Sequence, residues 1–176
     1  SNMRNRYLGL IFLGLFLLEG TLVQWLIPGG WQQKLSLAPH FTLVALLIYS
    51  IYRNRHIALM FGLVIGLVHD IVYASPMIGA HGFGMAIITY IAGIAAKRIK
   101  LNIAITFVIL TLSIVFYDGI VFSLYRLFRV TVMPYASMVI DYLLPTLLLN
   151  LLFAIFIYVP LRRMLEMKTE KREEEG

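Results

Sequence analysis

The feature that most constrains this chain is a series of six apolar stretches, which proline, glycine and charged residues separate from one another. A helix needs roughly 20 apolar residues to cross a hydrocarbon core about 30 Å thick. A barrel of membrane strands would instead need alternating apolar and polar residues, a pattern that this sequence lacks. We therefore expect an all-α polytopic membrane protein with six transmembrane helices. Their expected spans are about 7–27, 37–52, 57–74, 82–97, 101–125 and 138–160.

The composition supports this fold class. Hydrophobic residues make up 60% of the chain and charged residues 14%, whereas soluble domains contain about 25% charged residues. Cysteine is absent, which excludes disulfides, thiolate metal sites and a cysteine nucleophile. We expect residues 1–2, ahead of Met3, to be the remnant of a tag. Residues 3–160 are expected to form one transmembrane domain, and the charged residues 161–176 a cytoplasmic tail.

The basic residues predict the orientation in the membrane. With the N-terminus in the cytoplasm, twelve lysines and arginines fall in inner segments and three in outer segments, as the positive-inside rule requires. Both termini are therefore expected in the cytoplasm. The inner bases that flank the spans are suited to anionic lipid headgroups, whereas a nucleic-acid partner would require clustered bases with exposed aromatic residues. These flanking bases are Arg53, Arg55, Lys97, Arg98, Lys100, Arg162 and Arg163.

Four acidic residues lie outside the tail, and all are expected in the outer half of the membrane or at its outer surface. They are Glu19, Asp70, Asp118 and Asp141. A charged side chain at mid-bilayer costs about 2.5–3.5 kcal/mol on insertion scales, so such residues usually face protein or water. Because two histidines share this level, we expect a polar zone that opens to the outside. Its expected members are Glu19, Asp70, Asp118, His40 and His81.

These residues do not suggest catalysis. His69 and Asp70 are adjacent, and neighbours at i and i+1 point to different faces of a helix, so we expect that they cannot bind one metal ion. The sequence has no H-E-x-x-H motif and no Gly-rich phosphate loop. We therefore expect no catalytic residue, no metal and no cofactor. Acids on one side of the membrane also provide no path for an ion. The alternative to a shared zone is that each acid is protonated or is satisfied by a local Tyr, Ser or backbone group.

The third span combines small residues with a carboxylate. Gly62, Gly66 and Asp70 lie at i, i+4 and i+8, on one stripe of a helix. A G-x-x-x-G pair lets another helix backbone approach closely. We interpret the stripe as a groove that seats a helix, the chain's own or a partner's, with the carboxylate as a polar stop near the outer face. Pro76 and Gly79 then predict a tight outer turn into the next span.

Four features follow one another along the chain: a proline at the start of the second span, an inner loop with arginine, the motif G-x-x-x-G-x-x-x-D and the motif P-x-x-G. The positions are Pro39, Gly62, Gly66, Asp70, Pro76 and Gly79, continuing through Gly82 into Tyr90 and Gly93. In this pattern the chain resembles the family of the rod shape-determining protein MreD. Length and six-span topology agree as well, so the resemblance covers nearly the whole chain, and residues 59–93 are its most specific part.

The resemblance implies a non-enzymatic component of the bacterial elongation machinery in the cytoplasmic membrane. MreC, a single-span protein with a large outer domain, is the implied partner. The filament protein MreB, the cell-wall synthase RodA and a penicillin-binding protein belong to the same machinery. The family's bundle is similar to the substrate-binding subunits of energy-coupling-factor vitamin transporters.

Two functional hypotheses follow from the resemblance. In the first, the protein is a scaffold that seats the MreC transmembrane helix and helps to control cell shape through lateral peptidoglycan synthesis. In the second, it is a small-molecule-binding subunit of an energy-coupling-factor transporter. The sequence leaves open whether the chain forms a homodimer.

Overall fold

The structure, a computed structural model, describes residues 2–26, 40–72 and 77–174. All regular elements in these residues are helices, so the expected all-α class is confirmed for this part of the chain. In chain order they are α1 (Asn2–Leu26), α2 (Phe41–Tyr52), α3 (Arg55–Val72), α4 (Ala80–Arg98), α5 (Ile103–Leu127), α6 (Tyr135–Met138), the π-helix η1 (Val139–Leu143) and α7 (Leu144–Glu174). Ser1 of the expected tag remnant, Pro39 and Pro76 lie outside the described residues.

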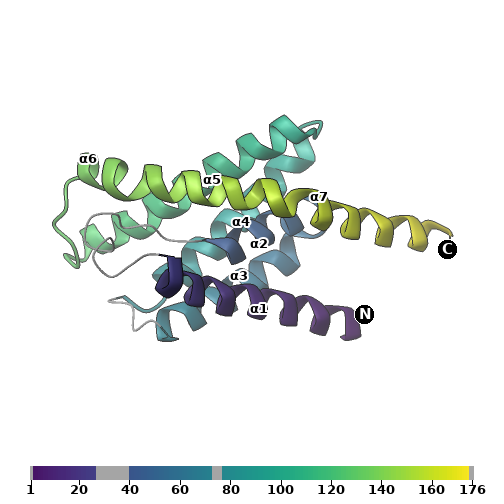
Figure 1. The fold of residues 1–176 in the computed structure, drawn as a ribbon, viewed down its shortest axis with the longest axis horizontal. Helices are drawn as coiled ribbons and strands as arrows, with labels where there is room; N and C mark the ends of the chain where they lie inside the picture. Colours follow the sequence, from purple (N-terminus) through teal and green to yellow (C-terminus); the bar gives the residue numbers. More distant parts are fainter. Residues whose placement is uncertain (1, 27–39, 73–76, 175–176) are drawn as a thin grey trace.

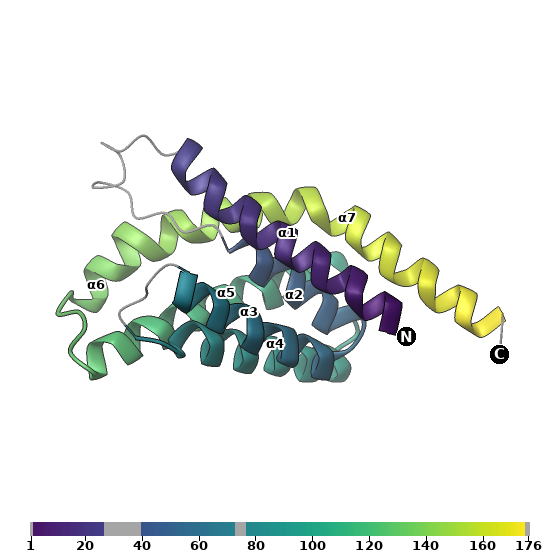
Figure 2. The ribbon, with the colours of Figure 1, turned by 90° about the horizontal axis from the view of Figure 1, so that it is seen from below.

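The helices form an elongated bundle in which helices joined by a loop run antiparallel, whereas α6, η1 and α7 follow one another in one direction (Figure 1). The start of α1 and the end of α7 lie at the same end of the bundle, which we call the terminal end (Figures 1 and 2). The end of α5 and the short helix α6 lie at the opposite, distal end. The six expected apolar stretches fall on α1 through α5 and on the continuous segment α6–η1–α7; their boundaries differ by a few residues, except that α7 continues to Glu174.

α2 is the central helix, and it contacts α1, α3, α4, α5 and α7. Every residue from Phe41 to Ile51 is buried. A helix that is apolar on all sides is typical of a buried position. With 12 residues, α2 reaches about 18 Å, well short of a hydrocarbon thickness of about 30 Å. Because the longer helices surround it, α2 needs no surface of its own toward lipid.

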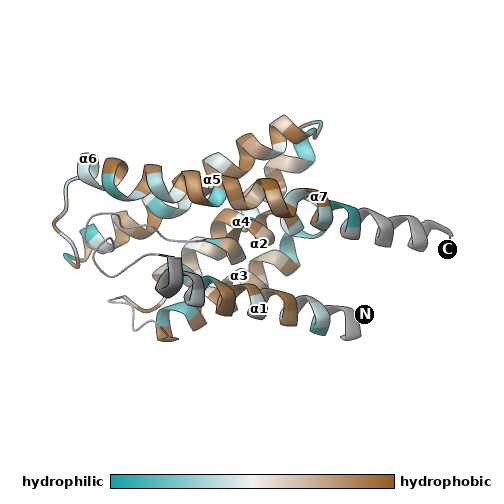
Figure 3. Cartoon of the chain, viewed as in Figure 1, coloured by the Kyte–Doolittle hydropathy of each residue, from teal (hydrophilic) through white to brown (hydrophobic). Residues whose placement is uncertain are grey.

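The surrounding helices expose large apolar side chains on their outer faces. Examples that are more than half exposed are Ile71, Phe83, Phe116, Leu148 and Phe156. In Figure 3, apolar residues dominate the middle of the bundle, and polar residues are most frequent toward its two ends. Three described segments are long and apolar enough to cross a membrane by length and composition: Arg55–Val72, Ile103–Leu127 and Tyr135–Arg163. These features are those of a membrane protein.

The last helical segment differs from its prediction at both ends. The expected span 138–160 begins in a wide turn, where the N–H of Leu144 bonds to a carbonyl five residues back. Pro145 follows directly, and it favours such a turn because it has no N–H and its ring crowds the carbonyl four residues earlier. α7 then continues through Pro160. Residues 161–174 therefore extend the helix, and their Leu, Met, Arg, Lys and Glu residues are good helix formers.

A polar cluster joins three helices near the terminal end. The Tyr52 hydroxyl lies 2.8 Å from Thr106 Oγ1 and 2.7 Å from the Tyr158 hydroxyl. Arg162 donates to the Tyr158 hydroxyl at 3.1 Å, and its guanidinium lies over the Tyr52 ring. These contacts connect α2, α5 and α7 close to the basic residues of this end.

Candidate functional site

The small-residue stripe of α3 packs against α4. Its buried residues are Ala58, Gly62, Gly66 and Asp70, at intervals of four. A Cβ atom on Gly62 would lie 3.2 Å from the backbone carbonyl of Met85. A Cβ on Gly66 would lie only 2.5 Å from the backbone nitrogen of Gly82. The two helix backbones therefore touch along the stripe, as small residues at this spacing allow.

The groove expected for a partner helix is thus filled by the chain's own α4, which corrects that interpretation. Both occupants were open from the sequence, because the spacing of Gly62 and Gly66 is the same for either. α4 fits because it carries glycines of its own: Gly82 faces Gly66, and a Cβ on Gly93 would overlap Arg55 of α3. A partner helix could enter here only by displacing α4, so a seat for a partner must lie elsewhere.

Asp70 lies at the end of the stripe and closes the turn between α3 and α4. Its side chain is fully buried. Oδ2 accepts a hydrogen bond from the Gly79 N–H at 2.8 Å, and Oδ1 lies 2.6 Å from Nδ1 of His81. Gly79 has a φ of 103°, in the left-handed region that favours glycine. The carboxylate therefore holds the start of α4 against the end of α3.

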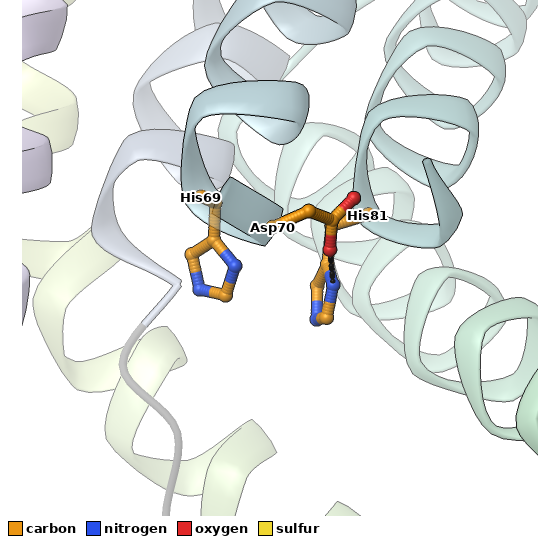
Figure 4. Close-up of side chains that lie close together, drawn as sticks. All are labelled: His69, Asp70 and His81. Atoms are coloured by element: carbon orange, nitrogen blue, oxygen red, sulfur yellow. Dashed lines mark hydrogen bonds and ion pairs between the residues drawn. The ribbon is translucent and has the colours of Figure 1, made fainter. Parts of the chain in front are cut away.

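His69 is part of the same group of side chains. Figure 4 shows the His69 and His81 imidazoles beside each other below the last turn of α3, with Asp70 next to His81. The two ring centroids are 4.4 Å apart, and one possible ligand atom from each of the three residues lies within 4.8 Å of the others. His69 and Asp70 therefore do not point apart as expected from their adjacency, while the expected absence of a metal stays a prediction. The side chains of successive helical residues point about 100° apart. His81 of α4 nevertheless lies close to both His69 and Asp70.

A second buried cluster joins α1, α2, α5 and α7. His40 Nε2 lies 2.8 Å from Asp118 Oδ1, and the His40 N–H donates to Asn150 Oδ1 at 2.6 Å. The Thr42 hydroxyl donates to Glu19 Oε2 at 3.0 Å. All five residues are buried. Glu19 and one carboxylate oxygen of Asp118 thus have partners on other helices, whereas Asp118 Oδ2 is buried with no hydrogen-bond partner in the part of the chain that the structure describes.

Tyr117 lies between the two clusters. Its ring centroid is 5.1 Å from that of His40 and 6.2 Å from that of His81. A cavity of about 230 Å³ lies beside the clusters, toward the distal end, and its polar lining includes His81, Asp118, Tyr125, Asp141 and Tyr142. The five residues expected in a polar zone therefore form two groups linked by one aromatic ring. Asp141 is exposed in η1 at the edge of the cavity.

Sequence reasoning missed three residues of these clusters: Thr42, Tyr117 and Asn150. A signal existed for Asn150, because it interrupts the apolar run LLLNLLF and an amide inside a membrane span requires partners. The hydroxyl residues carry no comparable signal, since a Thr side chain can bond to its own helix backbone at any position.

Comparison with known proteins decides the family. The chain matches the family model described as rod shape-determining protein MreD over residues 3–168. The chain belongs to the MreD family. A curated "Rod shape-determining protein MreD" from Bacillus subtilis (strain 168) is 30% identical over 139 residues, which cover 78% of this chain and 80% of that protein. No solved structure matches the chain, so the expected likeness to energy-coupling-factor subunits stays a prediction.

Membership of the MreD family assigns the chain to the rod system that determines bacterial cell shape. The role of this family is structural and shape-determining, and the expected absence of catalysis stays a prediction. The small-molecule-binding subunit of a transporter is not favoured by either match.

Proposed function

We propose that the chain is a non-enzymatic membrane scaffold of the rod system, which binds MreC and helps to control cell shape through lateral peptidoglycan synthesis. The observation that carries this proposal is the family match, which includes all of the helical bundle except the last turns of α7. The two buried polar clusters support it, because they connect six helices into one body that can present a constant surface. MreB, RodA and a penicillin-binding protein are then further members of the same assembly.

We infer that the terminal end of the bundle faces the cytoplasm. The start of α1 and the end of α7 lie together there, and so do the loops between α2 and α3 and between α4 and α5. Basic residues lie at these loops and in the C-terminal half of α7, and a cytoplasmic position for them follows the positive-inside rule. Lys97, Arg98, Lys100 and Arg163 are exposed. Their charges favour contact with anionic lipid headgroups.

The seat proposed for the MreC transmembrane helix is an apolar groove on α5. Seven residues line this groove of about 520 Å³: Val115, Phe116, Gly119, Ile120, Ser123, Leu124 and Leu127. A Cβ on Gly119 would have no neighbour within 4 Å. Gly119 and Ser123 form a small-xxx-small pair, which lets a second helix approach closely. The stripe on α3 is covered by α4, whereas no described atom of the chain lies within 4 Å of a Cβ on Gly119.

Co-purification of MreC with two matched variants tests the proposal. Gly119→Leu places bulk in the α5 groove, whereas Gly14→Leu places the same bulk on the exposed face of α1, where a Cβ also has no neighbour within 4 Å. Neither change is expected to disturb the packing of the bundle, because the added Cβ meets no described atom at either position. Recovery of MreC is expected to fall about tenfold with Gly119→Leu, which corresponds to about 1.4 kcal/mol, and to stay at the wild-type level with Gly14→Leu.

Equal recovery of MreC with both variants would place the seat away from α5. Failure of the wild-type chain to recover MreC at all would contradict the scaffold proposal itself. Gly66→Leu is unsuitable for this test, because its side chain would overlap the backbone of α4 and would disturb the fold together with any partner.

A further inference from the structure

We propose that His69, Asp70 and His81 form a binding site for a divalent transition-metal ion of the Zn²⁺ class. The three residues come from the last turn of α3 and the first turn of α4 (Figure 4). This inference does not depend on the scaffold function, because it concerns the ends of two helices and not the surface of α5.

The backbone brings the ligands together before any ion binds. The contact between Gly66 and Gly82 sets the distance between α3 and α4 one turn below the site. Asp70 is held from its other side by the Gly79 N–H at 2.8 Å, and such hydrogen bonds to a ligating carboxylate orient it toward a metal. One ligand atom from each residue already lies within 4.8 Å of the others. The site therefore needs small side-chain movements and no rearrangement of helices.

The ligand set selects the class of ion. Two imidazoles and one carboxylate are the protein ligands of many zinc sites that keep a fourth position open. Mg²⁺ and Ca²⁺ instead prefer oxygen ligands throughout. His69 and His81 are partly exposed. His81 also lines the cavity of about 230 Å³, so the fourth position is left to water or to a group that enters this cavity.

Metal binding changes one contact of the described structure. Asp70 Oδ1 and His81 Nδ1 are 2.6 Å apart in a hydrogen bond, whereas two ligands on a tetrahedral zinc ion are separated by about 3.3 Å. The ion would take the place of the hydrogen in this bond: a neutral His81 would then carry its hydrogen on Nε2 with no net release, whereas a charged His81 would release one proton to solvent. The second carboxylate oxygen keeps its bond to the Gly79 N–H.

The test measures zinc bound to the purified full chain without an affinity tag. The protein is incubated with ZnCl₂ in detergent and desalted, and retained zinc is determined by mass spectrometry. One zinc ion per chain is expected. His69→Gln removes one ligand and leaves the Asp70–His81 pair intact, so zinc affinity is expected to fall by more than the about 10–100-fold that loss of an outer-shell partner causes. His56→Gln is the matched control, because His56 is an exposed histidine at the other end of α3.

Cobalt provides a second measurement that does not depend on variants. Co²⁺ added to the wild-type chain is expected to give the visible absorption bands of a four-coordinate site, and added Zn²⁺ is expected to remove them. Absence of retained zinc and of cobalt bands in the folded wild-type chain would overturn the proposal. Equal zinc binding by His69→Gln and His56→Gln would overturn it as well.

Discussion

Replacing Gly66 by alanine is expected to destabilise the bundle by about 1–3 kcal/mol, the usual cost of overpacking a close contact. The new Cβ would lie 2.5 Å from the Gly82 nitrogen and 2.7 Å from the His81 carbonyl carbon. Both are backbone atoms, so no change of rotamer can relieve the overlap. α3 and α4 must move apart by about 1 Å before the contacts reach van der Waals distance. This movement also stretches the hydrogen bond between Asp70 and His81.

Three further alanine variants provide the comparison. At Gly62 the nearest backbone atom lies at 3.2 Å, and at Gly14 and Gly119 nothing lies within 4 Å. We expect an intermediate loss for Gly62→Ala. The two open positions should be neutral or stabilised, because alanine is favoured over glycine in a helix by about 1 kcal/mol.

Thermal unfolding in a single detergent measures this series. For a chain of this size, 1 kcal/mol corresponds to about 2–4 °C in melting temperature, so Gly66→Ala should melt roughly 2–12 °C below the wild type. A melting temperature for Gly66→Ala that equals that of Gly14→Ala would refute the backbone contact between α3 and α4. A greater loss for Gly62→Ala than for Gly66→Ala would also contradict the geometry.

Two other predictions concern the buried polar groups. Asp70→Asn should retain most cell-shape function in a complementation assay, since asparagine can still accept from the Gly79 N–H and donate to His81. Asp70→Leu should lose this function, because it leaves buried polar groups unpaired at about 1–3 kcal/mol each; equally complete failure of Asp70→Asn would show that the charge itself is needed. Asn150→Ala removes the acceptor of the buried His40 N–H, so the free energy of unfolding should fall by about 1–3 kcal/mol. An unfolding free energy unchanged in Asn150→Ala would contradict the buried hydrogen bond.

The helices could be predicted from the sequence, because in a membrane the hydropathy of a segment alone is enough to favour a helix. A backbone in hydrocarbon must satisfy its own polar groups, so an apolar run of sufficient length forms a helix whatever its neighbours are. The continuation of α7 through Pro160 was not predicted, because a proline removes one hydrogen bond and only the surrounding turns decide whether the helix survives. The short α2 was predicted as a span like the others, since its apolar sequence is compatible with lipid and with a protein core alike.

The candidate site could be predicted only in part. The level of Glu19, Asp70 and Asp118 in the membrane follows from counting residues along each span. Their partners do not, because His40 and Asp118 are 78 positions apart in the chain and no spacing rule connects them. For the same reason, the closeness of His69 to His81 was missed: a rule about neighbours on one helix does not consider a side chain that a second helix brings in.

By itself, the sequence determined that this chain enters a membrane and which segments form its helices. It also determined at which positions a glycine leaves the helix backbone without a covering side chain. Those properties depend on hydropathy and on the absence of a side chain, and both are local. The tertiary structure alone decided that α4 occupies the glycine stripe, that the buried acids pair with histidines or threonine from other helices, and that α5 keeps an open groove. These outcomes depend on which helices become neighbours, and a helix–helix contact joins residues that are distant in the chain.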